Sequence, residues 1–578
     1  MGVTTARERL RARGSPERLL ARAVRLLAAE PPRVGRWSGE AVFLSAAIVL
    51  QWLALVGLVA SARHNGWLFY QGGDQTFFYT IAWIVAHGHL PVTGIGYAWS
   101  LVEAPVAAVA GPSFLHALPG IVAVQVLLLL PLGLVAFYAL VKRLLGPLMA
   151  RVGALAWVVA PYAAIPLFVD RYHARWVDQT IPQLVGLTGM GDFATLVILT
   201  AAAYFVFRHL DDGDWESAAL AGLLAGLAVG VKPSTGLFLA GPAAAFLLAR
   251  QLPGAAAFAA GLAPALLTLA LWKQRGLGYQ PLFATGAPVR AAVGSGLAPE
   301  LVGATGIRRY VDFDWGNLGH NLDLIREYFW SNRLVEWLPL AGAVGALRRS
   351  PPKAVLLAVW LAAYVVVKGT NRVSSVDTAS FWRLLAPAWP AYLLLALSIV
   401  ALVPTVGPLV TGAAATPAGG GRPRSLRRPL VAAAIVLGLV PLAIVAALPR
   451  DTEHRGVRDG SRNLYVAVDP AFRPATTVRG GRVTLTWTGP SSGSVRPTYI
   501  VWRSRARFAG DDAVDCDSAP VPSCTVRGDE LGYTSPPFVD RPGPGRWVYR
   551  VAQAADYTGD AGSGDPLVYS QAVTATVR

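Results

Sequence analysis

The chain has 578 residues, of which 54% are hydrophobic and only 15% charged, and its mean hydropathy is +0.45. Soluble proteins carry about 25% charged residues, so the composition excludes a purely soluble enzyme and predicts a polytopic membrane protein with one soluble part. The net charge of +17 does not indicate nucleic acid as a partner, because Lys and Arg lie in short segments between apolar runs, as in membrane proteins.

Residues 1–37 precede the first apolar run and are rich in Arg. No small-residue cleavage site follows that run, so the segment does not have the pattern of a secretory signal. We expect a basic cytoplasmic tail. Two interpretations stay open: a segment that touches anionic lipid headgroups, and a disordered tail without a role.

Apolar runs between residues 38 and 449 predict about eleven transmembrane helices. The segment 411–429 between the last two runs is rich in Gly, Pro and Arg, which is typical of a flexible linker. The predicted spans are 39–61, 116–140, 149–168, 190–208, 216–231, 235–249, 254–272, 336–348, 353–368, 384–408 and 430–448.

Charge predicts the orientation of these spans. Lys and Arg gather in alternate connections, at 142–151, 250, 348–353 and 422–428, whereas the segment 64–114 contains neither. Because cytoplasmic loops are enriched in Lys and Arg, we expect the N-terminus in the cytoplasm. An odd number of spans then places the C-terminus outside the cell membrane.

Three outer segments, 62–115, 169–189 and 273–335, are longer than a connection requires and mix aromatic with charged residues. The inner connections are mostly short. Since binding and catalytic residues are disproportionately carried by such loops, the outer face is the expected working face of the protein.

From about residue 455 the chain changes to short alternating runs such as RVTLTWTG, PTYIVWRSR and GRWVYRVAQAA, separated by turn residues. This pattern predicts an antiparallel β-sandwich over 455–578. The Trp of TLTWTG and the Tyr of WVYRVAQAAD resemble those of fibronectin type III or immunoglobulin-like domains, a resemblance that concerns the fold and says little about function. Cys516 and Cys524 are the two cysteines of the chain, and in an exported segment we expect them to form a disulfide.

Three motifs of the membrane part carry chemistry. The first is GGDQTFFYTIAWIVAHGHLP, in which Asp74 begins a helix that ends before Pro91. The second is AGLLAGLAVGVKPSTGLFL with Lys232, and the third is FWRLLAPAWPAYLLLALS with Arg383. In this order, over residues 40–410, they resemble GT-C glycosyltransferases such as protein O-mannosyltransferases and lipid A aminoarabinose transferases.

The resemblance implies a GT-C-like membrane domain, a polyprenyl-phosphate-linked sugar as donor, and Asp74 as the catalytic residue on the outer face. In those families an Asp-Glu pair begins the first motif, whereas Gln75 stands second here. A helix N-cap is the alternative role for Asp74. We expect the apolar side of the helix, with Phe77, Ile81 and Ile84, to lie on the membrane surface.

The chemistry of the basic residues independently favours a phosphate site. A sugar carried on a lipid phosphate leaves an anion behind, and a nearby cation stabilises the charge that develops. Lys232 and Arg383 lie at outer ends of spans and are the expected phosphate-binding residues, with Arg308 and Arg309 as weaker candidates. The alternatives are snorkelling for Lys232, a topological anchor for Arg383 and solvated surface charge for the other two.

Three further acids are candidates for the second acid or for acceptor binding: Asp170, Asp178 and Glu103. Arg171 and Arg175 lie beside the first two, so local ion pairing is the alternative, and an interface position is the alternative for Glu103. A divalent cation, Mg²⁺ or Mn²⁺, is compatible with such acids, and nothing in the sequence requires one.

The sequence therefore predicts an integral membrane glycosyltransferase that moves a sugar from a polyprenyl-phosphate donor to a glycan, lipid or protein acceptor of the cell envelope. Its expected partners are this donor, this acceptor and membrane lipids, with no nucleic acid. A transporter or lipid flippase is the alternative, although we find no internal repeat of the kind that transporters show. An inactive scaffold that displays the β-domain is a third interpretation, and Gln75 keeps it open.

Overall fold

The computed structural model describes residues 38–61, 73–91, 93–163, 182–278, 280, 313–328, 333–371, 374–377, 380–404, 407, 410, 426–450, 456–459, 464–490, 498–505, 529–555 and 565–578. The segment 1–37 and six of the predicted residues lie outside these ranges. The six are Asp170, Asp178, Arg308, Arg309, Cys516 and Cys524. Asp74 lies in a described helix, but its side chain falls outside the described part.

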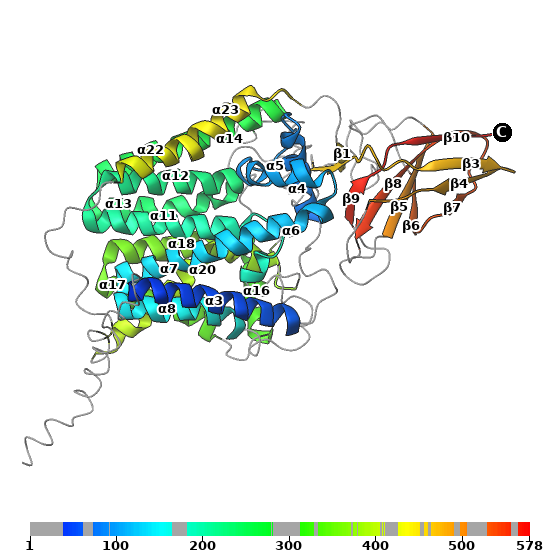
Figure 1. The fold of residues 1–578 in the computed structure, drawn as a ribbon. Coiled ribbons are helices and arrows are strands. Elements are labelled where there is room, and N and C mark those ends of the chain that lie inside the picture. The colour runs from blue at the N-terminus through cyan, green and yellow to red at the C-terminus, as the bar shows by residue number, and fades with distance from the viewer. Residues whose placement is uncertain are drawn as a thin grey trace, which may run out of the picture.

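The regular secondary structure of the described membrane part is helical (Figure 1). Its helices include short π-helical and 3₁₀ segments, which carry the prefix η. They are α3 (Gly39–Ser61), α4 (Gly73–Ala86), α5 (Ala98–Ala110), α6 (Phe114–Val124), η1 (Gln125–Leu129), α7 (Leu130–Leu145), α8 (Pro147–Ala163), α10 (Pro182–Val185), α11 (Asp192–Asp212), α12 (Trp215–Val231), η3 (Pro233–Leu239), α13 (Ala240–Ala249), α14 (Leu252–Leu277), α16 (Trp315–Tyr328), α17 (Leu334–Arg349), α18 (Pro351–Gly369), α19 (Ser380–Leu385), η6 (Ala386–Ala388), α20 (Trp389–Ser398), η7 (Ile399–Leu402), α22 (Arg427–Ala433), η8 (Ala434–Leu439) and α23 (Val440–Ala447).

Every predicted span overlaps helix within the described residues. Within the described residues, seven helical stretches are long and apolar enough to cross a membrane: Gly39–Ala60, Phe114–Leu145, Asp192–Asp212, Leu252–Leu277, Pro351–Gly369, Ser380–Leu402 and Arg427–Ala447. The helices at the other predicted spans are shorter. They are α8, α12, α13 with η3, and α17. The helical membrane part of the predicted fold class is therefore confirmed.

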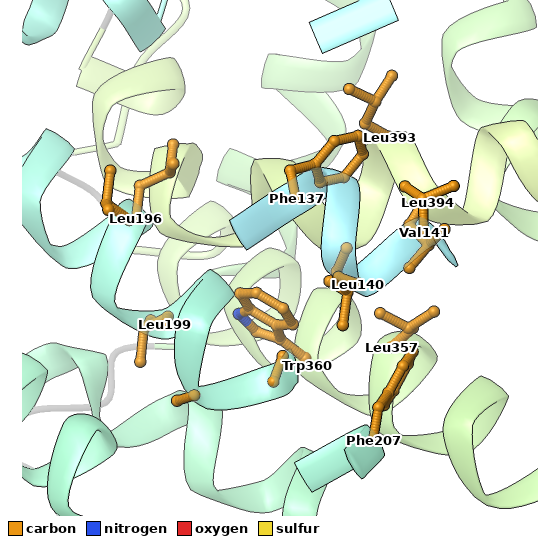
Figure 2. Packing of buried hydrophobic residues seen from close by; sticks show 14 of the residues in the cluster. Phe137, Leu140, Val141, Leu196, Leu199, Phe207, Leu357, Trp360, Leu393 and Leu394 are labelled. Carbon is orange, nitrogen blue, oxygen red and sulfur yellow. The ribbon is translucent and has the colours of Figure 1, made fainter. Parts of the chain in front are cut away.

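The helices enclose one large apolar core (Figure 2). Phe137 of α7, Phe207 of α11 and Trp360 of α18 are fully buried in it. Leu and Ala residues of α8, α12 and α20 fill the space between these rings. Such a core holds the helix ends in fixed relative positions, because close-packed interiors transmit displacements rather than absorb them.

The described part of the predicted first outer segment contains the helices α4 and α5, and α4 ends at Ala86 as the motif predicted. The expectation that α4 lies on the membrane surface is wrong. Ile81 and Ile84 are fully buried in a second apolar cluster with residues of α5 and α6. Phe77, near the start of the same apolar face, packs against the C-terminal domain. The apolar face of α4 therefore contacts protein along its length.

The C-terminal domain is a sandwich of two antiparallel sheets, as predicted. One sheet has the order β10-β8-β5-β6, with β9 also paired to β8, and the other has the order β3-β4-β7. Trp487 and Tyr549, from the two predicted motifs, are buried in the apolar cluster between the sheets. The strands are β1 (Gly456–Asp459), β2 (Leu464–Ala467), β3 (Ala475–Arg479), β4 (Arg482–Thr486), β5 (Thr498–Ser504), β6 (Asp529–Thr534), β7 (Phe538–Asp540), β8 (Gly545–Ala555), β9 (Asp565–Tyr569) and β10 (Val573–Val577).

The sandwich docks on the outer helices through the other face of its five-stranded sheet (Figure 1). Phe77 of α4 packs there against a cluster that includes Trp502 of β5 and Val548 of β8. The segment that leads into the domain is also fixed, because the Leu90 N–H donates to the Pro449 carbonyl over 2.6 Å. The domain is thus held against the helix that Asp74 begins.

Candidate functional site

A buried loop, residues 186–191, lies where the sequence motifs meet. Its Gly189 N–H donates to the side-chain oxygen of Gln75 over 2.7 Å, and the Trp99 indole N–H donates to the Gly189 carbonyl over 3.0 Å. The Gln125 amide donates to the carbonyls of Thr188, over 2.6 Å, and Met190, over 3.1 Å. Side chains from α4, α5 and η1 therefore fix both polar groups of Gly189 and the residues on either side.

Local sequence explains how Gln125 reaches this loop. It begins the π-helical segment η1, which joins α6 to α7. An extra residue per turn rotates the side chains that follow, and such π segments occur frequently at functional sites. Gln125 is fully buried, so its amide needs polar partners, and the loop carbonyls provide them.

The loop ends at an ion pair. Asp192 begins α11 and is 1% exposed at its side chain, and the Lys232 ammonium lies 2.5 Å from its carboxylate. Lys232 follows the last residue of α12, and Pro233 then begins the 3₁₀ segment η3, as the second motif predicted.

A second lysine accompanies this pair. Lys368, in the last turn of α18, lies within electrostatic range of both Lys232 and Asp192. Tyr364, one turn earlier on α18, is fully buried and within range of Asp192. Two lysine side chains and one carboxylate therefore lie within electrostatic range of one another.

The predicted residues are therefore brought together in part. Gln75, which follows Asp74, is joined through Gly189 and the loop to the Lys232–Asp192 pair. Arg383 lies on α19, which packs against α18, the helix that carries Lys368. The contacts described here do not connect Arg383 to Lys232 directly.

Sequence reasoning missed Asp192, Lys368, Trp99 and Gln125. Asp192 and Lys368 each occupy the end of an apolar run that the sequence predicts to be the outer one, as Lys232 does, and ionisable residues in such places are costly unless they are functional or paired. A search of every span end for ionisable residues would therefore have identified both Asp192 and Lys368. Trp99 and Gln125 act through backbone contacts distant in sequence, and the sequence carries no signal for these.

Glu103 occupies a different place from the interface position that the sequence left open. It lies on α5, outside the seven candidate spans, and is 1% exposed. Within the described residues, neither of its carboxyl oxygens has a hydrogen-bond partner. Burial raises the pKa of this carboxyl well above its usual range, and the nearby Trp99 indole only partly opposes the shift. The surroundings of Glu103 therefore disfavour its ionised form.

Replacing Glu103 by Gln is expected to stabilise the protein at alkaline pH. Because the folded state raises the pKa of this acid, its favourable neutral form is fully present below the unfolded value of about 4.5 and is lost as the pH rises through the folded pKa. The variant cannot ionise, so its Tm in detergent should exceed that of the wild type by several degrees near pH 8 and match it near pH 4. Equal Tm differences at both pH values would contradict a buried neutral acid.

The described part of the chain contains no cluster of three or more His, Cys, Asp or Glu side chains that is placed to hold a metal ion. Asp74, Asp170 and Asp178 are outside that search because their side chains are not described. The expectation of a possible Mg²⁺ or Mn²⁺ ion therefore stays a prediction about those residues.

No family model and no curated protein sequence matches the chain. Among solved structures it is similar to the oligosaccharyltransferase of Archaeoglobus fulgidus, a GT-C enzyme. The apo form aligns with 14% identity and a TM-score of 0.37, over 71% of this chain and 57% of that one. The form tethered to an acceptor peptide gives 11% and 0.36, and the complex with an inhibitory peptide and a dolichol-phosphate gives 12% and 0.36, each over 71% of this chain and 56% of that one.

The chain thus matches little more than half the length of the archaeal enzyme. At these identities and TM-scores, the likeness assigns neither an activity nor a site to this chain. The function is therefore inferred below from the residues of the chain itself and from the contacts that join them.

Proposed function

We propose that the protein is an integral membrane glycosyltransferase that moves a sugar from a polyprenyl-phosphate donor to an acceptor of the cell envelope on the outer face of the membrane. The observation that carries the proposal is the buried loop 186–191. It links the helix that Asp74 begins to the Lys232–Asp192 pair, so two motifs far apart in sequence contribute to one site.

The cations of this site suit a lipid phosphate. Lys232 is compensated by Asp192 at 2.5 Å, and Lys368 adds a second lysine side chain within electrostatic range of both. Charge-assisted hydrogen bonds to phosphate oxygens are about twice as strong as neutral ones. In a site that excludes water, these ammonium groups stabilise the phosphate that leaves when the sugar is transferred. Arg383 on the adjacent α19 is a further candidate for this role.

Asp74 is proposed to activate the acceptor. A carboxylate beside the anomeric carbon takes the proton of the attacking hydroxyl, the bond from that oxygen to carbon forms, and the bond to the phosphate oxygen breaks. The proton ends on Asp74 and the electron pair on the lipid phosphate. If a divalent cation is needed, Asp74 with Asp170 or Asp178 would hold it, and it would neutralise phosphate charge.

The β-sandwich is proposed to position the acceptor. It packs on α4 through Phe77, so it is held against the helix that Asp74 begins. A disulfide between Cys516 and Cys524 is proposed to close a loop of this domain, and a short closed loop stabilises a fold by about 2–3 kcal/mol.

The proposed orientation, with a cytoplasmic N-terminus and the sandwich outside, rests on the absence of Lys and Arg from residues 64–114. A phosphatase reporter that is active only outside the cytoplasm, fused after Arg578, is expected to be active. A reporter that works only in the cytoplasm is expected to stay inactive. Activity of the second reporter alone would reverse the topology.

The proposed activity is tested with the full-length protein in nanodiscs. Polyprenyl-phosphate sugars with a radiolabelled sugar are supplied as a panel of donors, together with a cell-envelope extract as acceptor. Transfer of label into the extract, with release of polyprenyl phosphate, is the expected result. Movement of intact donor between leaflets without release of the phosphate would favour a flippase instead.

A further inference from the structure

A lysine that no motif identified is held near the outer end of α14. Lys273 is 7% exposed, and its ammonium donates to the carbonyls of Gly94 and Ile95, the latter over 3.0 Å. The neighbouring Trp272 indole N–H donates to the same Ile95 carbonyl over 3.0 Å. An ionisable side chain buried within an apolar helix costs free energy unless it has a function or a partner. We therefore asked what the contacts of Lys273 do.

The two carbonyls belong to a connection, residues 93–97, that touches the end of α12. A Cβ atom on Gly96 would lie only 2.2 Å from the Gly230 carbonyl oxygen and 2.5 Å from that of Val231. Tyr97 packs against the last turn of α12, since a Cβ atom on Gly230 would lie 2.8 Å from its ring. Only a glycine at position 96 permits this approach of the two backbones.

Lys232 comes directly after Gly230 and Val231, so the connection supports the residue that pairs with Asp192. Each step between Lys273 and Lys232 is a hydrogen bond or a close backbone contact. Coupling over several residues is carried by such contiguous packed contacts. Trp272 strengthens the support, because its ring also packs on Tyr97 with centroids 6.4 Å apart.

We infer that Lys273 is a positioning residue of the outer site: through residues 93–97 it fixes the end of α12, and thereby aims Lys232 at the phosphate of the donor. The inference rests on the proposed function. Lys273 does not touch the donor itself, since its ammonium is directed to the two carbonyls.

The test measures binding of a short-chain polyprenyl monophosphate to the full-length protein in nanodiscs, alongside the KM and kcat of transfer. Lys273→Met is expected to weaken phosphate binding and raise the donor KM on the order of tenfold, the effect of losing about 1.4 kcal/mol, with a smaller change in kcat. Lys273→Arg keeps N–H donors at this position and should restore most of the affinity. Lys142→Met, a control at the inner end of α7 where Lys142 is 43% exposed, should bind as the wild type does.

Two further variants keep the test decisive. Gly96→Ala forces its Cβ against the α12 carbonyls and should weaken phosphate binding even if Lys273→Met folds poorly. Lys232→Met combined with Lys273→Met should bind no worse than Lys232→Met alone, because both changes remove the same contact. Additive losses, or unchanged binding in Gly96→Ala, would overturn the inference. If Lys232→Met itself leaves phosphate binding unchanged, the proposed phosphate site fails instead.

Discussion

Replacing Asp74 by Asn is expected to abolish sugar transfer while the protein folds and inserts as the wild type does. A general base contributes roughly 10²–10⁴-fold to a rate, and Asn cannot accept the proton of the acceptor. Asn caps a helix about as well as Asp does, a role worth only ~1 kcal/mol. The contacts that hold α4, from Gln75 to Gly189 and from Phe77 to the sandwich, do not involve the substituted atoms.

The measurement is transfer of labelled sugar in nanodiscs, with Tm in detergent as the check on folding. Asp214→Asn is the matched control, because Asp214 is the N-cap residue of α12 and its carboxylate accepts a hydrogen bond from the Ser217 hydroxyl. It should keep wild-type transfer. Wild-type transfer by Asp74→Asn would show that the acid only caps α4, and would remove the basis of the proposed catalysis.

The long helices and the β-sandwich were predictable because their signals are periodic and local. Runs of apolar residues gave each span, and alternation gave the strands that bury Trp487 and Tyr549. The position of α4 was not predictable in this way. Its apolar residues fit a membrane surface and a protein interior equally well, and the packing of α5, α6 and the sandwich around it decides between them.

Site residues were predictable only where the local sequence around a single residue marks it as unusual. Lys232 is a charge at the end of an apolar run, and the structure places it there. Gln75 was read as a missing acid, whereas its side-chain oxygen accepts the Gly189 N–H. That hydrogen bond joins residues 114 positions apart, so it follows from the packing of α4 against the loop and from no local pattern.

The interpretation of Gln75 affects the function as well. An amide that holds a buried backbone N–H has a structural reason to be present, so the loss of an acid at position 75 does not by itself indicate an inactive scaffold. Any second acid then has to come from elsewhere, and Glu103 is a poor choice because it is buried and its burial disfavours the ionised form. Asp170 and Asp178 remain the candidates.

The Lys232–Asp192 pair gives the second large expected effect. Lys232→Met should abolish transfer and also destabilise the protein, since it leaves the Asp192 carboxylate, 1% exposed, without its cation. Breaking one side of a buried pair costs about 3–5 kcal/mol. Lys368→Met should weaken transfer with little loss of stability, because Lys232 still compensates Asp192. The two variants are therefore expected to differ in stability: Lys232→Met lowers both the Tm and the use of the donor, whereas Lys368→Met raises the donor KM and leaves the Tm nearly unchanged.

A double variant separates structure from function at this pair. Replacing both members of a buried ion pair by apolar residues is often neutral for stability or even stabilising, so Lys232→Met with Asp192→Leu should recover the Tm that Lys232→Met loses. If the pair only holds α11 to the end of α12, transfer should recover with it. We expect transfer to stay lost, because no ammonium at position 232 then faces the phosphate. Recovery of transfer together with Tm would make Lys232 a structural residue and leave Lys368 and Arg383 as the candidates for the donor phosphate.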